Sequence, residues 1–362
     1  RWINYIYSPN LILRYKLENS KKGGLNLANS NRRNSYILII CGLLLLSLGI
    51  FLSVSIGAKD IDFSTMINSL FGQGNDINSK IIRDVRIPRA LAGVLVGGFL
   101  AVSGAIMQGI TRNPIAEPSV IGITQGATFM VAIALVLQQV NSNIVIGGFS
   151  LMIFAFLGAS ISGLFVYFVS SRSMGKTDPV KLTLAGTALG TLLISLATGA
   201  AMYFNLSQQL SFWINGGFIG VNWEGVKLLF IVGIIGMVCA MVMAKRITIL
   251  SLGEDVAIGL GENTNRTRFI SLVIVILLTG ASVSVAGNII FVGLIIPQIA
   301  KKLVGVDFKY IIPCSFVLGS VLIVYSDVIS RLINPPYETP IGSLTALLGV
   351  PVFIYLIRKE VK

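Results

Sequence analysis

The sequence contains no histidine, only three cysteines and few charged residues, and each shortage excludes a class of protein. Without histidine there can be no Ser-His-Asp or Cys-His catalytic site, and the commonest side-chain metal ligand is missing. Cys41, Cys239 and Cys314 form no Cys-x-x-Cys pair, so the sequence has no zinc-ligand spacing and no disulfide framework. Charged residues make up 12% of the chain and hydrophobic residues 54%, against about 25% charged in an average soluble domain. This composition excludes a disordered chain and argues against a water-soluble globule.

Long apolar stretches occupy most of the 362 residues. A bilayer core of about 30 Å requires about 20 apolar residues in a helix, and ten stretches approach that length. They are 36–56, 88–109, 119–140, 144–170, 183–204, 226–244, 269–286, 289–304, 311–330 and 342–357. The eighth is short and contains Pro297 and Gln298. The sequence therefore predicts an all-α polytopic membrane protein, with ten transmembrane helices in a compact bundle and both termini on one side.

The distribution of Lys and Arg predicts which side that is. With the N-terminus in the cytoplasm, the inner segments carry 21 basic residues and the outer segments 7, as the positive-inside rule requires. The net charge of +13 then lies wholly on the inner side, which removes the need for a nucleic-acid partner to explain it. Residues 1–35 are polar and basic, and we expect a cytosolic tail that buries no core, with a helix on the membrane surface as the alternative. Residues 36–362 form the transmembrane domain.

Glycine pairs one helical turn apart occur within the predicted spans. They are Gly93 and Gly97, Gly122 and Gly126, and Gly186 and Gly190. Small residues at this spacing let helix backbones approach closely in lipid, where no hydrophobic effect drives helices together. The glycines therefore favour a compact bundle over loosely arranged anchors.

The energy source of a transporter built this way is constrained by what the spans lack. Ion-coupled transporters usually place ionisable residues deep in the membrane, whereas Arg89 and Asp327 lie near the predicted outer ends. Asp327 and Arg331, four residues apart, are expected to pair as a structural tie. The Gly-Lys-Thr sequence at 175–177 resembles the end of a phosphate-binding loop, but position 170 is serine rather than glycine and no soluble domain surrounds it. Any ATPase is therefore a separate polypeptide, and an ion-coupled secondary transporter or a channel is the alternative class.

The longest inner loop, 245–268, contains a candidate docking segment. Residues 251–261 predict a short helix with two carboxylates in its first turn and glycines near its end. Leu252, Val256 and Leu260 recur every four residues, and such an apolar face is suited to a groove on a partner protein. An ordinary solvated turn is the alternative.

At this segment the chain resembles the FecCD-type permeases, the membrane subunits of ATP-binding-cassette (ABC) importers for iron siderophores, haem and cobalamin. Five further stretches match the same family in order along the chain. They are RIPR at 86–89, QGITRNPIAEP at 108–118, IGITQGA at 121–127, GNIIFVGLIIP at 287–297 and PIGSLTALLGVP at 340–351. The resemblance covers about 80–357, nearly the whole transmembrane domain.

The resemblance implies a permease subunit of a bacterial importer in the cell membrane, and it favours a ferric siderophore as substrate over cobalamin or haem. The implied partners are a pair of cytosolic ATPases, an extracytoplasmic binding protein and a second permease that is identical or homologous. ATP would be bound by the ATPases, and this chain would hold no cofactor, no metal and no catalytic residue. Many members of the family have Pro-His where this chain has Pro297-Gln298, a departure that weakens a haem assignment.

The resemblance also assigns roles to residues. Contact with the ATPase would be made by Leu252, Gly253, Glu254, Asp255, Ala257, Gly259, Leu260 and Gly261 of the coupling helix. Docking of the binding protein would use Arg86, Arg89 and Arg331, whose planar guanidinium groups suit carboxylates, with snorkelling to the membrane interface as the alternative. The translocation path and its inner gate would be formed by Gln108, Asn113, Pro114, Thr187, Thr191, Ser195 and Thr198. The four hydroxyl residues lie on one helix face, and helix packing is their alternative role.

Overall fold

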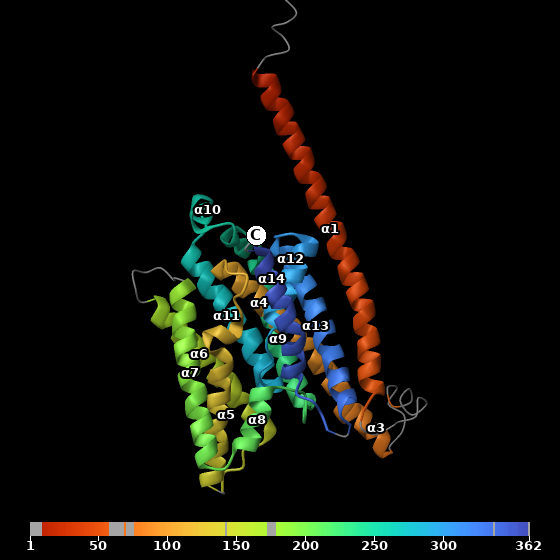
Figure 1. The fold of residues 1–362 in the computed structure, drawn as a ribbon, viewed down its shortest axis with the longest axis vertical. Coiled ribbons are helices and arrows are strands. Elements are labelled where there is room, and N and C mark those ends of the chain that lie inside the picture. The colour runs from red at the N-terminus through yellow and green to blue at the C-terminus, as the bar shows by residue number, and fades with distance from the viewer. Residues whose placement is uncertain are drawn as a thin grey trace, which may run out of the picture.

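A computed structural model describes residues 9–57, 69, 76–141, 143–171, 179–335 and 337–360, and within these ranges every regular element is helical (Figure 1). The main helices are α1 (Pro9–Ser55), α4 (Ile87–Thr111), α5 (Ile123–Val140), α6 (Gly148–Ser171), α7 (Pro179–Tyr203), α9 (Trp223–Ser251), α11 (Thr264–Ala286), α12 (Val292–Val304), α13 (Phe308–Ile333) and α14 (Ile341–Glu360). Shorter elements are α3 (Ile77–Ile81), a π-helical turn (Ile82–Arg86), a 3-10 turn (Pro118–Ile121), α8 (Ser207–Asn215) and α10 (Glu254–Gly259).

Eight of these helices are long and apolar enough to cross a membrane. They include α1, α5, α6, α7, α9, α11 and α13, together with the continuous helical stretch from Ile77 to Thr111. The remaining two predicted spans correspond to α14 and to the 13-residue α12, whose rise of about 20 Å is shorter than a bilayer core. The predicted class, an all-α polytopic membrane protein, is confirmed, while the number of crossings and the side of each terminus stay predictions.

The centre of the bundle is formed by α4 and α11, which are buried along most of their length. α4 packs against α13, α11, α9 and α12. Two glycines make its closest contacts possible, because a Cβ on Gly97 would collide with the backbone of Gly319 in α13 and a Cβ on Gly104 with the backbone of Gly293 in α12. Gly97 thus takes the close-contact role predicted from its spacing, and the bundle is held by backbone approach as well as by apolar side chains.

The other helices surround this centre in two groups. On one side α5 packs against α6 and α7, and on the other α1 packs against α13, which also contacts α14. α10 and the C-terminus lie at one end of the bundle and α3 and α8 at the opposite end (Figure 1). We call these the α10 end and the α8 end.

Several boundaries differ from the sequence prediction. The eighth span was placed at 289–304, but α12 begins at Val292 because positive φ angles at Gly287 and Phe291 keep residues 287–291 out of the helix. The second helix extends back from Pro88 to Ile77, so that Arg86 is helical. Within the tail predicted over 1–35, the described residues from Pro9 onward are helical and continue into α1, while the cytosolic location of the tail stays a prediction. α8 was not predicted at all.

The contact between Gly97 and Gly319 predicts opposite outcomes for two matched substitutions. Gly97→Ala forces apart the backbones of α4 and α13, and overpacking of this kind costs about 1 to 3 kcal/mol of unfolding free energy. Gly199→Ala on α7 meets open space, so it should leave stability unchanged or raise it slightly. Thermal unfolding of the detergent-solubilised proteins measures both, and equal midpoints would contradict the proposed contact.

Candidate functional site

The predicted coupling segment forms a sharp connection between α9 and α11 at the α10 end. α9 continues to Ser251, and Gly253, with a φ of 135°, turns the chain into the six-residue α10. Leu252 and Leu260 expose 57% and 64% of their surface, and Val256 and Ile258 are also exposed. These four side chains, which we call the apolar ridge, form a surface that an isolated globule would bury.

The predicted coupling residues fall into two groups: some are exposed on or beside the apolar ridge, and others hold α10 against the rest of the protein. Asp255, Gly259, Leu260 and Gly261 are exposed, whereas Ala257 is fully buried. Glu254 faces the protein itself, because its carboxylate accepts a hydrogen bond of 2.9 Å from Nη2 of the buried Arg268. Arg112, which ends α4, lies 3.9 Å from the same carboxylate. Ala257 and Glu254 therefore hold α10 against α4 and α11 rather than presenting it outward.

The three arginines predicted to dock the binding protein lie together at the α8 end, but Arg86 and Arg89 are buried and the Arg331 side chain is only 7% exposed. Nη1 of Arg86 donates to the backbone oxygens of Val54 and Ser55, at 2.9 and 2.8 Å. Arg331 donates to the backbone oxygens of Ser53 and Ile56. Both arginines thus satisfy carbonyl groups that the C-terminal turn of α1 leaves without intrahelical partners.

Arg89 joins three segments through two carboxylates. Its Nη2 lies 2.7 Å from Oδ1 of Asp327 on α13, and its Nη1 lies 2.6 Å from Oε1 of Glu338 in the connection to α14. Asp327 also pairs with Arg331 at 2.8 Å, which confirms the predicted structural tie. We call Arg86, Arg89, Arg331, Asp327 and Glu338 the charged cluster. Its arginines are engaged within the chain, so this arrangement supports a structural role and leaves their docking role a prediction without geometric support.

The predicted gate residue Gln108 lies in a polar network between α4 and α12. Its side-chain nitrogen donates to the backbone oxygens of Gly293 and Leu294, and its oxygen accepts from Gln298 at 2.7 Å and from Lys301 at 3.2 Å. Gln298 also donates to the backbone oxygen of Pro114 at 3.0 Å. The glutamine that replaces the histidine of many family members is therefore a hydrogen-bonding bridge, and it brings Gln108 and Pro114 together.

The connection after α4 is shaped by its own side chains. The Asn113 carboxamide oxygen accepts a hydrogen bond from the backbone nitrogen of Ile115, at 3.1 Å, which is the geometry of an Asx turn. Glu117 accepts from the backbone nitrogen of Phe291, at 2.8 Å, at the start of α12. This connection is thereby fastened to α12, and Asn113 acts within the turn rather than facing the other gate residues.

The hydroxyl residues of α7 lie on an exposed face. Thr187, Thr191, Ser195 and Thr198 are all exposed, and the first three donate to the backbone oxygen four residues earlier in the same helix. A cavity of about 250 Å³ lies where Thr187 and Thr191 meet Gln125 and the turn at Ser119. Because these residues are exposed in the single chain, their side chains are open to a partner subunit or a solute.

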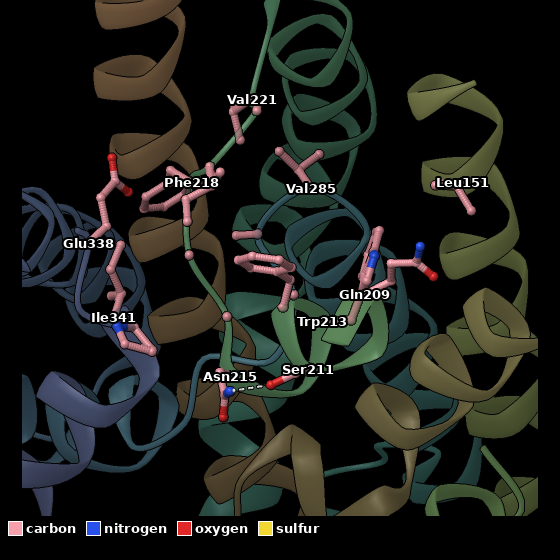
Figure 2. Close-up of a pocket in the computed structure, with 18 of the residues that line it drawn as sticks. Leu151, Gln209, Ser211, Trp213, Asn215, Phe218, Val221, Val285, Glu338 and Ile341 are labelled. Atoms are coloured by element: carbon pink, nitrogen blue, oxygen red, sulfur yellow. Dashed lines mark hydrogen bonds between the residues drawn. The ribbon is translucent and has the colours of Figure 1, made fainter. Parts of the chain in front are cut away.

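A larger cavity, of about 850 Å³, lies at the α8 end. It is bounded by α8, by the connection 216–221, by the start of α6, the end of α11 and the start of α14 (Figure 2). Trp213 and Phe218 contribute aromatic surface, and Gln209 and Asn215 contribute amides. Glu338 of the charged cluster reaches its edge. We call this cavity the outer pocket.

The described part of the chain is a bundle of apolar helices with an exposed apolar ridge at one end and a large pocket at the other, an arrangement that suits a membrane transport protein. The model of the FecCD transport family matches residues 44–359, and the chain belongs to that family. It is similar to the iron(3+)-hydroxamate import system permease protein FhuB of Bacillus subtilis (strain 168), with 48% identity over 91% of this chain and 85% of that protein.

Two further comparisons agree. The Fe(3+)-citrate import system permease protein YfmD of the same organism is 38% identical over 91% of this chain and 98% of its own length. A solved structure of a metal-chelate type ABC transporter, in an inward-facing conformation, superimposes with a TM-score of 0.76 at 28% identity and covers 89% of this chain and 98% of that one. The chain is therefore a multi-pass protein of the cytoplasmic membrane and a permease of the ABC importer class.

The sequence alone did not single out Glu338, Arg268 or Lys301, which bind Arg89, Glu254 and Gln108. Glu338 was only one of several acidic residues in predicted outer loops, and nothing local linked it to Arg89. Arg268 and Lys301 contributed only to the count of inner basic residues, and no local pattern linked them to Glu254 or to Gln108. Only Gln298 gave a signal, because it departs from the pattern of the family.

The burial of the charged cluster predicts that Arg89 is required for stability. Arg89→Met leaves the Asp327 and Glu338 carboxylates without their shared partner, and breaking a buried ion pair in this way costs about 3 to 5 kcal/mol. We expect a clear drop in the thermal unfolding midpoint of the detergent-solubilised protein. Arg266→Met, at an exposed position on α11, is the matched control. An unchanged midpoint with loss of binding-protein association alone would instead establish the docking role.

Proposed function

We propose that the chain is the membrane subunit of a binding-protein-dependent ABC importer that moves a ferric siderophore into the cytoplasm, driven by separate ATPase subunits. The apolar ridge carries the mechanistic part of this proposal, because it offers a rigid, projecting surface on which a moving partner can act. The topology predicted from the distribution of Lys and Arg would place the α10 end in the cytoplasm and the α8 end outside. The iron-chelate permeases among the relatives favour a ferric chelate over cobalamin or haem.

Force would pass from the ATPase to the membrane helices through the contacts that hold α10 against its neighbours. Glu254 pairs with Arg268 on α11, and α11 packs along the central α4. α10 also follows directly from α9. Movement of the ridge would therefore reach α9, α11 and α4 together, and α4 and α11 form the centre of the bundle.

The second permease, identical or homologous, would cover the exposed face of α7. Only 22% of the apolar part of α7 is buried, although four hydroxyl residues, Thr187, Thr191, Ser195 and Thr198, lie along one face of this helix. Two such faces opposed across a dimer would enclose a hydroxyl-lined path between them, which a single chain leaves open. Gln108, Gln298 and Pro114 would then control the cytoplasmic end of that path by holding α4 to α12.

The ridge assignment predicts that one charge abolishes coupling. Val256→Asp puts a carboxylate into the apolar surface that the ATPase would cover, so we expect loss of ATPase copurification and of ATP-driven uptake with the protein still inserted in the membrane. Val145→Asp is the matched control, because Val145 is 84% exposed in the connection between α5 and α6 at the α8 end. If Val256→Asp retains both properties, the ridge is not the coupling surface.

The function itself predicts a dependence of uptake on ATP. In cells lacking this chain, uptake of radioactive ferric siderophore should fall to background and should return with the complemented chain. In proteoliposomes holding the complete transporter and its binding protein, uptake should require ATP inside the cytoplasmic compartment. Uptake that follows an imposed ion gradient in the absence of ATP would favour the secondary transporter instead.

A further inference from the structure

The carboxylate of Glu117 is bound to the backbone at the start of α12. Glu117 lies in the connection between α4 and α5, outside both spans, and is partly buried there. Its Oε1 accepts a hydrogen bond of 2.8 Å from the backbone nitrogen of Phe291. Phe291 has a φ of 69°, in the left-handed region, and its own carbonyl oxygen accepts the first hydrogen bonds of α12, from Leu294 and Ile295. One titratable side chain therefore holds the residue at which α12 begins.

The next turn of α12 is held by a neutral side chain of α4. Pro297 has no backbone N–H, so the carbonyl oxygen of Gly293 lacks the donor that a helix would otherwise supply one turn later. The Gln108 carboxamide donates to this oxygen instead, at 3.2 Å, and also to the carbonyl oxygen of Leu294, at 3.0 Å. Gln108 and Glu117 thus fasten α12 to α4 and to the connection that follows α4.

The position of α12 depends on these two contacts because its backbone is interrupted on both sides. Positive φ angles at Gly287 and Phe291 precede the helix, and another at Gly305 follows it. The Phe291 side chain also occupies the space that a Cβ on Gly349 of α14 would need. A change at Phe291 would therefore reach α12 and α14 together.

The charged and titratable groups on the elements around Glu117 are bound elsewhere or exposed. Arg112 and Arg268 contact Glu254, and Lys301 donates to Gln108. Lys302 lies over the ring of Tyr355, and Arg89 belongs to the charged cluster at the α8 end. The others on α7 and α11 are exposed, namely Lys181, Tyr203 and Arg266, and α5 carries none. Within the described structure, the Glu117 carboxylate is therefore compensated by hydrogen bonds alone.

Burial makes ionisation of this carboxyl group unfavourable. It raises the pKa of Glu117 from an ordinary value of 4.5 to about 7, and the hydrogen bonds from Phe291 and Ser119 lower the pKa only in part. The group thus binds a proton more tightly in contact with α12 than it would in water. By linkage, protonation stabilises the contact with Phe291 and ionisation favours its release. The protonated group still offers a carbonyl oxygen to the Phe291 nitrogen.

We propose that Glu117 is a positioning residue of the cytoplasmic gate, whose neutral form fastens the start of α12 to the connection after α4 and whose ionised form lets α12 move. Because α12 also carries Gln298 and Lys301, which bind Gln108, release at Phe291 would loosen the whole gate network. The inference rests on the proposed function only for the role of this network as a gate, and the contact itself can be tested without transport.

The test measures hydrogen exchange over residues 287–296, in the complete permease and ATPase complex in lipid nanodiscs, with intrinsic chemical exchange corrected for. In the wild type, opening of this segment should become about tenfold more frequent from about pH 6 to about pH 8, because the carboxyl group has a pKa of about 7 in the closed contact and 4.5 in water. Glu117→Gln keeps an acceptor oxygen without a charge, so we expect strong protection that is equal at both pH values. Glu117→Leu removes the acceptor, so protection should be lost at both.

Glu224→Gln, at an exposed position in the first turn of α9, is the matched control and should keep the pH dependence of the wild type. The inference is overturned if exchange in the wild type is independent of pH, if Glu117→Gln keeps the wild-type dependence, or if Glu117→Leu is as protected as Glu117→Gln.

ATP-driven uptake by the full transporter with its binding protein is measured in parallel. Uptake by the wild type relative to Glu117→Gln should rise severalfold between the same two pH values, and this ratio cancels any pH dependence of the ATPase. A ratio that is equal at both values overturns the gate role, because α12 would then move without controlling transport. Absence of uptake for every ferric chelate defeats the proposed function, whereas intact uptake with exchange that is independent of pH defeats only the role of Glu117.

Discussion

The backbone contact between α4 and its neighbours is the constraint on which the rest of the structure depends. In lipid, apolar side chains gain nothing by leaving one apolar environment for another, so helices associate through close packing and hydrogen bonds. At Gly97 and Gly104 the absence of a Cβ lets α4 touch the backbones of α13 and α12. This places α12 directly against the central α4 although it is too short to cross the membrane alone.

The charged cluster follows from that arrangement. Once α4 and α13 are in contact, Arg89 and Asp327 face each other in a position where an unpaired charge would be costly. The π-helical turn from Ile82 to Arg86 adds one residue to the turn before α4, and Arg86 there meets the end of α1. Packing at the centre and ion pairing at the α8 end are thus consequences of one geometry, and they join α1, α4 and α13.

Much of this organisation could be predicted from the sequence, because span length and helix spacing are local properties. The apolar stretches, the Asp327 and Arg331 pair and the projecting segment at Leu252 all depend on residues within a few turns of each other. The pairing of Arg89 with Glu338 depends on a fold that brings together residues 249 positions apart. The start of α12 was misplaced for a similar reason, since Glu117 from a distant connection stabilises the irregular backbone at Phe291. Family resemblance singled out Arg86, Arg89 and Arg331 as candidates for docking, but it could not reveal that this chain's own carboxylates and carbonyl groups already bind them.

The same pairing determines how the α8 end meets a solute. Arg86, Arg89 and Arg331 keep their charge when they cap α1 or pair with Asp327, so three guanidinium groups stand against two carboxylates beside the outer pocket. Amide and aromatic side chains of α8 line the pocket itself, and they offer hydrogen-bonding groups and apolar surface rather than charge. The interactions that stabilise the bundle therefore also determine the charge at the edge of this pocket, so a substitution that alters one alters the other.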